Sequence, residues 1–304
     1  MKKVAISIGD LNGIGIEIAL GAHKELSKII KPIYIIDKTM LKQAAKLLKI
    51  SVPKDFKTIS PKAKKFKIKP GKVSKKSGEY SIFSFAKAIK LAELGVVDAI
   101  CTLPINKESW SKAGFNYVGH TDFLRGYFNK DAIMMLGCQE LYVALFTEHI
   151  ALKEVATKVK TKRLKEFLLD LSSSLNTKEQ IGVLGLNPHA GDNGVLGNEE
   201  KKIKKAIKKV NKKLGFKQYV GVLVPDIAFT PNVRKKYKYM VAMYHDQGLA
   251  PLKALYFDKS INVSLNLPIL RTSVDHGTAF DIAYKGAKLN LQSYINAIEF
   301  IVEN

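Results

Sequence analysis

The chain alternates between short apolar runs of strand length and longer segments in which apolar residues recur at helical spacing. The short runs end in polar or glycine-rich residues and predict β-strands at residues 2–9, 31–37, 96–105, 141–147, 181–187 and 239–245. Between several of them the spacing predicts helices at residues 14–29, 38–49, 78–94 and 199–216. This alternation predicts an α/β fold with a buried, largely central sheet.

Two of the predicted helices carry further signals. Ser77 directly precedes the helix at 78–94, and serine is a favoured N-cap residue. In the helix at 199–216, lysines fill one face, and the opposite face carries apolar residues at helical spacing: Ile203, Ile207, Val210 and Leu214. We interpret this helix as packed on the core with a solvated lysine face.

The lysines give the chain a strongly basic balance. Its 50 Lys and Arg residues stand against 27 Asp and Glu residues, which gives a net charge of +23. A charge of this size raises nucleic-acid binding as an alternative function. However, the lysines concentrate in residues 53–78 and 199–216 rather than around the polar loops, and no zinc-finger spacing occurs. We expect no nucleic-acid partner and interpret the charge as attracting an anionic substrate.

Composition and length are those of an ordinary globular protein, with 46% hydrophobic and 25% charged residues in 304 positions, enough for one large or two medium domains. Asp10, Asn12 and Glu17 interrupt the first apolar stretch, which argues against a signal peptide. No run reaches the roughly 18 apolar residues of a membrane span. Cys101 and Cys138 are too few for a disulfide framework. We expect a cytoplasmic protein without a membrane partner.

Chemically active residues follow the ends of several predicted strands. The segments that follow the strand ends, called strand exits below, have the sequences "SIGDLNG", "CTLPINK", "LFTEH", "LNPHAG" and "MYHDQG". In open α/β sheets, ligands bind outside the carboxyl ends of the strands. The exits therefore predict one shared cleft.

Three of these exits contain a histidine: His149, His189 and His245. One interpretation is three independent loop histidines. The other is a metal site, which is favoured by nearby carboxylates that could orient metal-bound imidazoles: Glu148, Asp192 and Asp246. Three neutral imidazoles with an open fourth position suit a catalytic Zn²⁺, with Co²⁺, Mn²⁺ and Mg²⁺ as alternatives.

Four motifs, in order, resemble those of the 4-hydroxythreonine-4-phosphate dehydrogenases of pyridoxal phosphate biosynthesis: "GHTDFL", "LNPHAGDNGVLGNEE", "MYHDQGLAPLK" and "LPILRTSVDHGTAFDIA". The resemblance runs from Gly9 nearly to the C-terminus. It implies a two-domain α/β/α fold like that of isocitrate and isopropylmalate dehydrogenases, with the active-site cleft between the domains. The first domain is expected at residues 1–122 plus 273–304, and the second at residues 123–272.

The resemblance also implies a homodimer with its active site at the subunit interface. One divalent ion (Zn²⁺, Co²⁺ or Mg²⁺) would be held by three histidines, one of them from the partner subunit; these match His149, His189 and His245. Family substrate contacts match His120, Thr121, Lys253, Asn262 and Arg271. The segment expected to contact NAD or NADP contains Asp275, His276 and Gly277.

The implied reaction is NAD(P)-dependent oxidation of 4-phosphooxy-L-threonine to 2-amino-3-oxo-4-phosphooxybutanoate, which decarboxylates to 3-amino-2-oxopropyl phosphate. Arg271 has the fork to grip a phosphate or carboxylate, and Lys253 can donate to an anion or to the reacting oxygen. Asp226 and Asp246 are candidates for proton handling or histidine orientation. A related dehydrogenase of 4-phospho-threonate or 4-phospho-erythronate is the alternative.

Local features qualify the resemblance. Thr121 or Asp122 would also serve as the N-cap of a helix in "GHTDFL". The family usually begins "GDPAGIGPE", whereas this chain has "GDLNGIGIE" and lacks both prolines, so we expect the turn to persist with less backbone restriction. Tyr284 stands where the family has a glycine. "GDLNGIG" is also not the G-x-G-x-x-G fingerprint and is interpreted as a tight turn that lines the cleft.

Overall fold

Strands from the two ends of the chain pair within one sheet. In the computed structural model, which describes residues 1–304, β11 (Arg271–Val274) runs parallel to β4 (Ala99–Thr102), with Arg271 opposite Ile100. This pairing joins residues 1–130, 261–263 and 267–304 into unit 1. Residues 131–260 and 264–266 form unit 2. The chain passes between the units at β10 (Ile261–Leu265).

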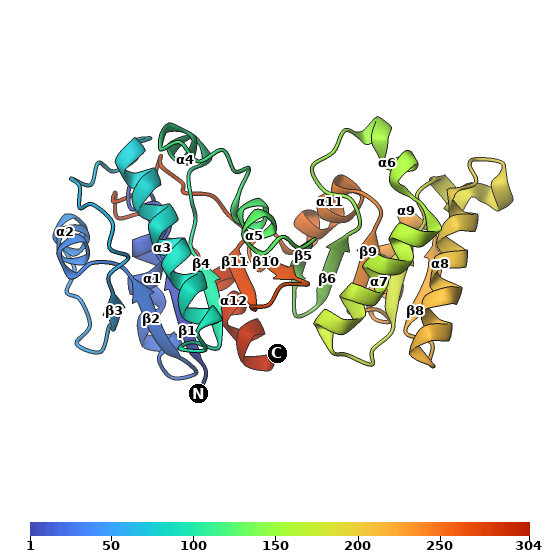
Figure 1. Ribbon diagram of the computed structural model, residues 1–304, viewed down its shortest axis with the longest axis horizontal. Helices are drawn as coiled ribbons and strands as arrows, with labels where there is room; N and C mark the ends of the chain where they lie inside the picture. Colours follow the sequence, from blue (N-terminus) through green and yellow to red (C-terminus); the bar gives the residue numbers. More distant parts are fainter. The chain divides into compact units, whose positions relative to one another are not determined.

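Unit 1 is a parallel sheet with strand order β3-β2-β1-β4-β11, covered by helices (Figure 1). Helix α3 packs against β1, β2 and β4, and α12 packs against β4, β11 and α1. Besides β4 and β11, its elements are β1 (Lys3–Ser7), α1 (Gly15–Leu26), β2 (Lys31–Ile35), α2 (Lys38–Leu48), β3 (Thr58–Ile59), α3 (Lys75–Glu93), α4 (Lys107–Lys112), α5 (His120–Phe128) and α12 (Gln292–Glu303). The core combines buried strand residues, among them Ala5 and Ile100, with buried residues of the covering helices, among them Phe85 and Ile89 of α3.

Helix α3 begins earlier than the sequence predicted. Its N-cap is Ser74, whose Oγ accepts a hydrogen bond from the Ser77 amide at 3.5 Å. The prediction that Ser77 is the N-cap was therefore wrong. The Ser77 hydroxyl donates instead to Asp10 Oδ2 at 3.1 Å, a tertiary contact that sequence spacing does not reveal.

Unit 2 has strand order β5-β6-β9-β7-β8, parallel except for the antiparallel pair β5 and β6 (Figure 1). Its strands are β5 (Ile133–Cys138), β6 (Leu141–Leu145), β7 (Ile181–Leu184), β8 (Tyr219–Leu223) and β9 (Tyr239–Ala242). Its helical elements are α6 (Leu152–Lys158), α7 (Thr161–Leu175), the short turn η1 (Pro188–Gly194), α8 (Glu199–Leu214), α9 (Pro225–Ala228), α10 (Pro231–Arg234) and α11 (His245–Tyr256).

Helix α8 has the predicted amphipathic character. Ile203, Ile207 and Val210 are buried, and all of its lysines are exposed. The lysine-rich sequence thus forms an ordinary core-packed helix with a solvated face. None of the helices combines the length and hydropathy that a membrane span requires.

The predicted α/β architecture is confirmed, but the division of the chain differs from the expected one. The sequence placed Asn262 and Arg271 in the second domain, whereas both belong to unit 1. Arg271 lies in β11, which pairs with β4 in the first sheet, and Asn262 lies in β10, the strand next to β11. The change of unit after α5 likewise falls at residue 130 rather than 122.

Candidate functional site

Arg271, at the start of β11, is 2% exposed. Its Nε and Nη2 donate to Thr102 Oγ1 at 3.1 and 2.7 Å, and its Nη1 donates to Asn262 Oδ1 at 3.4 Å. Burial lowers the pKa of Arg271 to about 9, so the guanidinium is still a cation at neutral pH. Thr102 was not identified as a site residue from the sequence, although the polar exit "CTLPINK" contains it.

His120 shares this buried environment. Its ring packs edge-on against Phe85 and Trp110, with ring centroids 4.7 and 5.5 Å apart. Burial and the Arg271 cation lower the pKa of His120 well below its ordinary value, so the imidazole is neutral at neutral pH. Its Nε2 is buried and has no hydrogen-bond partner in the chain. A polar nitrogen of this kind beside a buried guanidinium fits an anionic ligand that accepts hydrogen bonds from both.

The start of helix α5 carries His120 and Thr121 in its first turn, and both are buried. The N-cap is Gly119, and Asp122 Oδ2 accepts a hydrogen bond from the Val118 amide at 3.0 Å. The prediction of Thr121 or Asp122 as the N-cap was therefore wrong, because the helix begins at His120. Amides of a helix's first turn favour an anion, which agrees with the chemistry of His120 and Arg271.

In unit 2, strand pairing brings two of the three candidate metal ligands together. Strand β6 lies parallel to β9, and beyond the strands Thr147 continues the pairing through its amide to the Met243 carbonyl at 3.2 Å. His149 and His245 follow directly, with ring centroids 5.6 Å apart. Two imidazoles that share one metal at about 2 Å would have centroids roughly 5 Å apart. This pair therefore fits a shared divalent cation.

Asp246 determines which nitrogen of His245 faces that position. Its Oδ1 lies 2.6 Å from His245 Nδ1, which leaves Nε2 as the nitrogen for a metal. The contact favours histidine orientation over proton handling for Asp246, whose carboxylate is 84% exposed. In unit 2, Lys253 belongs to α11, and its Nζ lies over the Phe257 ring at 5.9 Å from the centroid.

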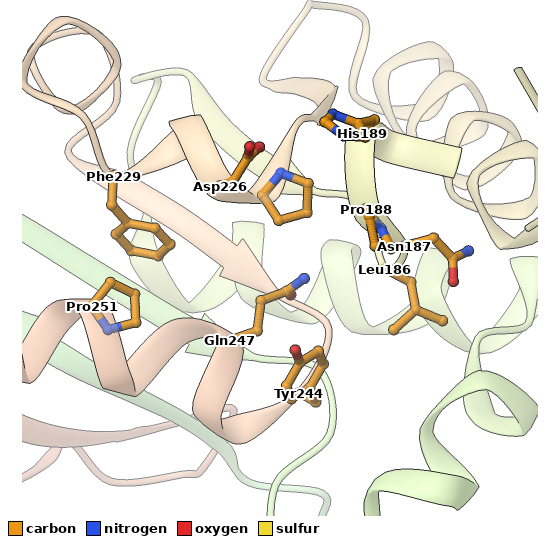
Figure 2. Close-up of a pocket in the computed structure, with 10 residues that line it drawn as sticks. Leu186, Asn187, Pro188, His189, Asp226, Phe229, Tyr244, Gln247 and Pro251 are labelled. Carbon is orange, nitrogen blue, oxygen red and sulfur yellow. The ribbon is translucent and has the colours of Figure 1, made fainter. Parts of the chain in front are cut away.

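His189 leaves the neighbouring strand β7, which pairs with the opposite edge of β9. It lines a cavity of about 450 Å³ (Figure 2). The other lining residues are Leu186, Asn187, Pro188, Pro225, Asp226, Phe229, Tyr244, Gln247 and Pro251. Within one chain, no three histidine, cysteine or carboxylate side chains converge as a metal site. A single chain thus offers two imidazoles in one place and a third elsewhere.

Comparison with known protein families decides the family of this chain. Residues 28–301 match the family model described as "Pyridoxal phosphate biosynthetic protein PdxA". The chain belongs to the PdxA family. This confirms the resemblance that the four motifs carried.

Individual PdxA relatives cover almost the whole chain. The 4-hydroxythreonine-4-phosphate dehydrogenase of Sulfurimonas denitrificans is 62% identical over 98% of this chain and 96% of its own length. Among solved structures, a putative 4-hydroxythreonine-4-phosphate dehydrogenase from Salmonella typhimurium is 33% identical with a TM-score of 0.86, covering 100% of this chain and 99% of that one. Isocitrate dehydrogenase from Methylococcus capsulatus, at 14% identity and TM-score 0.50 over 100% of this chain and 85% of that one, shares the fold.

The segment expected to contact the cofactor follows β11 in unit 1. The Asp275 amide donates to Ser293 Oγ at 3.1 Å, and His276 Nε2 is buried without a hydrogen-bond partner. A Cβ on Gly277 would meet nothing within 4 Å, so packing does not require glycine there. The role of Asp275, His276 and Gly277 in cofactor binding stays a prediction.

Tyr284, where this chain departs from the PdxA pattern, contacts the turn that lacks the family prolines. It has a φ of 60°, a left-handed conformation that usually favours glycine. Its amide donates to Glu17 Oε1 at 2.7 Å, and its hydroxyl donates to the Leu11 carbonyl at 2.8 Å. The two differences from the family pattern therefore lie in contact. Tyr284 hydrogen-bonds to the turn in which the family prolines are absent, and this contact helps to hold that turn.

Asp10, in the same turn, is fully buried and predicts a pH dependence of stability. Burial raises its pKa from 3.8 to about 6, although the Asn12 amide and Ser77 hydroxyl donate to it. The stabilising effect of the protonated form is complete below pH 3.8 and is lost as the pH rises through about 6. The free energy of unfolding of wild type minus that of Asp10→Asn should therefore fall by about 3 kcal/mol from pH 3.5 to 7.5.

Urea unfolding of both proteins across this pH range measures the difference. Asp258→Asn, at an exposed aspartate, controls for the loss of a surface carboxylate. A difference between wild type and Asp10→Asn that stays constant with pH would show that Asp10 titrates alike in the folded and unfolded chain.

Proposed function

We propose that this PdxA chain oxidises 4-phosphooxy-L-threonine at its secondary alcohol with NAD or NADP and a divalent metal ion. The product, 2-amino-3-oxo-4-phosphooxybutanoate, loses CO₂ to give 3-amino-2-oxopropyl phosphate, a step that serves pyridoxal phosphate biosynthesis. The buried Arg271 guanidinium beside the unpartnered His120 Nε2 is the observation that carries the proposal, because together they suit a phosphorylated substrate. The names of the relatives point to the same substrate.

The unit 1 residues bind the anionic groups. Arg271 donates from its fixed fork, which Thr102 and Asn262 hold in place. His120 is neutral, so its imidazole donates one hydrogen bond and adds no charge. Thr121 adds a hydroxyl at the start of α5. These donors orient the substrate before reaction, which lowers the entropy that the transition state must lose.

The unit 2 residues act at the reacting alcohol. The histidines would hold a divalent cation, which would supply Lewis-acid stabilisation of the negative charge on the substrate oxygen. Asp246 keeps His245 in the tautomer that exposes Nε2. Asp226 would take the hydroxyl proton and Lys253 would donate to the reacting oxygen, while NAD or NADP, when bound, would accept the hydride of the carbinol carbon. In the product, the polarised ketone accepts the electron pair of the breaking bond to the carboxylate, and CO₂ leaves.

The active form is proposed to be a cytoplasmic homodimer in which His189 of one subunit completes the His149 and His245 pair of the other. Two observations support this arrangement: the ring centroids of the pair lie 5.6 Å apart within one chain, and within that chain no third potential ligand completes a metal site. The two cysteines, Cys101 and Cys138, are buried and free, which agrees with a reducing compartment. No nucleic-acid or membrane partner is proposed.

The decisive experiment follows NADH or NADPH formation from 4-phosphooxy-L-threonine by purified protein. We expect turnover that EDTA abolishes and that Zn²⁺, Co²⁺ or Mg²⁺ restores, with parallel reactions separating NAD from NADP. Parallel assays offer 4-phospho-threonate and 4-phospho-erythronate. Turnover of those acids without turnover of the amino acid would replace the proposed substrate by the alternative one, and full activity after chelation would refute the metal site.

A further inference from the structure

The backbone that carries His189 adopts an unusual left-handed course. Its φ angles are positive at six successive residues: 51° at His189, 52° at Ala190, 80° at Gly191, 40° at Asp192, 55° at Asn193 and 107° at Gly194. Only two of these residues are glycines, and for each of the other four this conformation costs on the order of 1 kcal/mol. Such a turn persists only where surrounding contacts hold it.

A buried carboxylate from helix α8 makes those contacts. Glu200 is 4% exposed, and its Oε1 accepts hydrogen bonds from the amides of Leu186 and Asn187 at 3.0 and 2.8 Å. Its Oε2 accepts from Asn187 Nδ2 at 3.0 Å. A Cβ added to Gly191 would lie 2.5 Å from Glu200 Oε2, so the left-handed turn packs directly on the carboxylate.

The position of Glu200 explains why the chain turns where it does. The amide of Gly185 still bonds to the Leu223 carbonyl of β8 at 2.8 Å, as the last sheet contact of this strand. The next two amides, of Leu186 and Asn187, bond to Glu200 instead. The carboxylate therefore ends the strand and fixes the direction of the backbone two residues before His189.

We propose that Glu200 is a positioning residue for His189: it holds the left-handed turn and thereby aims the imidazole at the metal. This inference rests on the proposed function of His189 as a metal ligand. It implies that Glu200, a helix residue that does not itself bind the metal, contributes to metal affinity. Outer partners of metal ligands commonly change affinity by about 10- to 100-fold.

The test measures Co²⁺ binding to the folded protein together with its visible absorption spectrum. Glu200→Ala is expected to weaken Co²⁺ affinity by about 10- to 100-fold and to alter the spectrum, at a temperature well below its melting point. Glu200→Gln should retain most of the affinity, because its amide oxygen still accepts both backbone hydrogen bonds. It also keeps the test valid if the alanine variant folds poorly.

Glu199→Gln is the matched control. Glu199 precedes Glu200 in α8 and accepts from Asn187 Nδ2 at 3.0 Å, but it bonds neither amide before the turn. It should bind Co²⁺ like wild type. Equal affinity and spectrum in wild type and Glu200→Ala would refute the positioning role, whatever the change in melting temperature, because a purely structural residue affects stability alone.

Hydrogen exchange of the metal-free protein separates this inference from the proposed function. Faster exchange at the amides of Leu186 and Asn187 in Glu200→Ala, but not in Glu199→Gln, is expected. If wild type binds no Co²⁺, the proposed metal site is wrong. Exchange at Leu186 and Asn187 then still tests Glu200: faster exchange in Glu200→Ala shows that Glu200 holds the turn, and unchanged exchange shows that it does not.

Discussion

Replacing Arg271 with methionine is expected to lower kcat/KM for the phosphorylated substrate by about 1,000-fold, equal to about 4 kcal/mol of transition-state stabilisation. The variant removes the buried cation that faces His120 and bonds Thr102 and Asn262. Burial already disfavours the charged guanidinium, as its lowered pKa shows, so methionine of similar length should leave the melting temperature unchanged or higher. Activity and stability should thus separate.

Steady-state kinetics, calorimetric titration with the substrate and thermal unfolding measure these effects. Arg271→Lys is the informative comparison, because it retains a cation but loses the planar fork. It should bind substrate more weakly than wild type and more tightly than the methionine variant. Unchanged substrate affinity in Arg271→Met would place the anion site elsewhere in the molecule.

Loss of any one candidate metal ligand is expected to abolish activity, and mixing variants should restore it selectively. His189→Ala and His245→Ala are each inactive in this prediction. When equal amounts of the two variants are unfolded together and refolded, half of the dimers formed contain one subunit of each variant. Each of these mixed dimers has one complete site if His189 acts in trans. About a quarter of wild-type activity should therefore return.

A second mixture provides the control. His149 and His245 lie together in one chain, so a mixture of His149→Ala and His245→Ala leaves every site without one ligand. It should stay inactive. Recovery in this mixture, or none in the first one, would contradict the assignment of His189 to the partner subunit. Size-exclusion chromatography confirms that mixed dimers form.

Much of the local structure could be predicted from the sequence, because it depends on periodicity. The apolar face of Ile203, Ile207 and Val210 predicted helix α8, and short apolar runs predicted β6, β7 and β9. Those strands are parallel neighbours, so their polar exits had to meet at one edge of the sheet. The sequence accordingly located the three histidines on adjacent strand ends.

Contacts between distant segments were not predictable in the same way. Nothing near Ser77 in the sequence indicates that its hydroxyl bonds Asp10, and nothing near Arg271 indicates that Thr102 holds it. The observed domain boundary differs from the expected one for the same reason, because β11 pairs with β4, which is far from it in the sequence. Motif resemblance named Arg271 as a substrate contact, but only packing showed it to be buried beside His120.

By itself, the sequence determined which segments become strands and helices, which family the motifs resemble, and which side chains stand at strand exits. Hydrophobic periodicity acts within a few residues, and this makes such features readable along the chain. Tertiary structure alone decided that His149 pairs with His245 while His189 stands apart, and that Glu200 holds the left-handed turn before it. These are contacts across strands and from a helix to a loop, and their geometry arises only when the sheet forms.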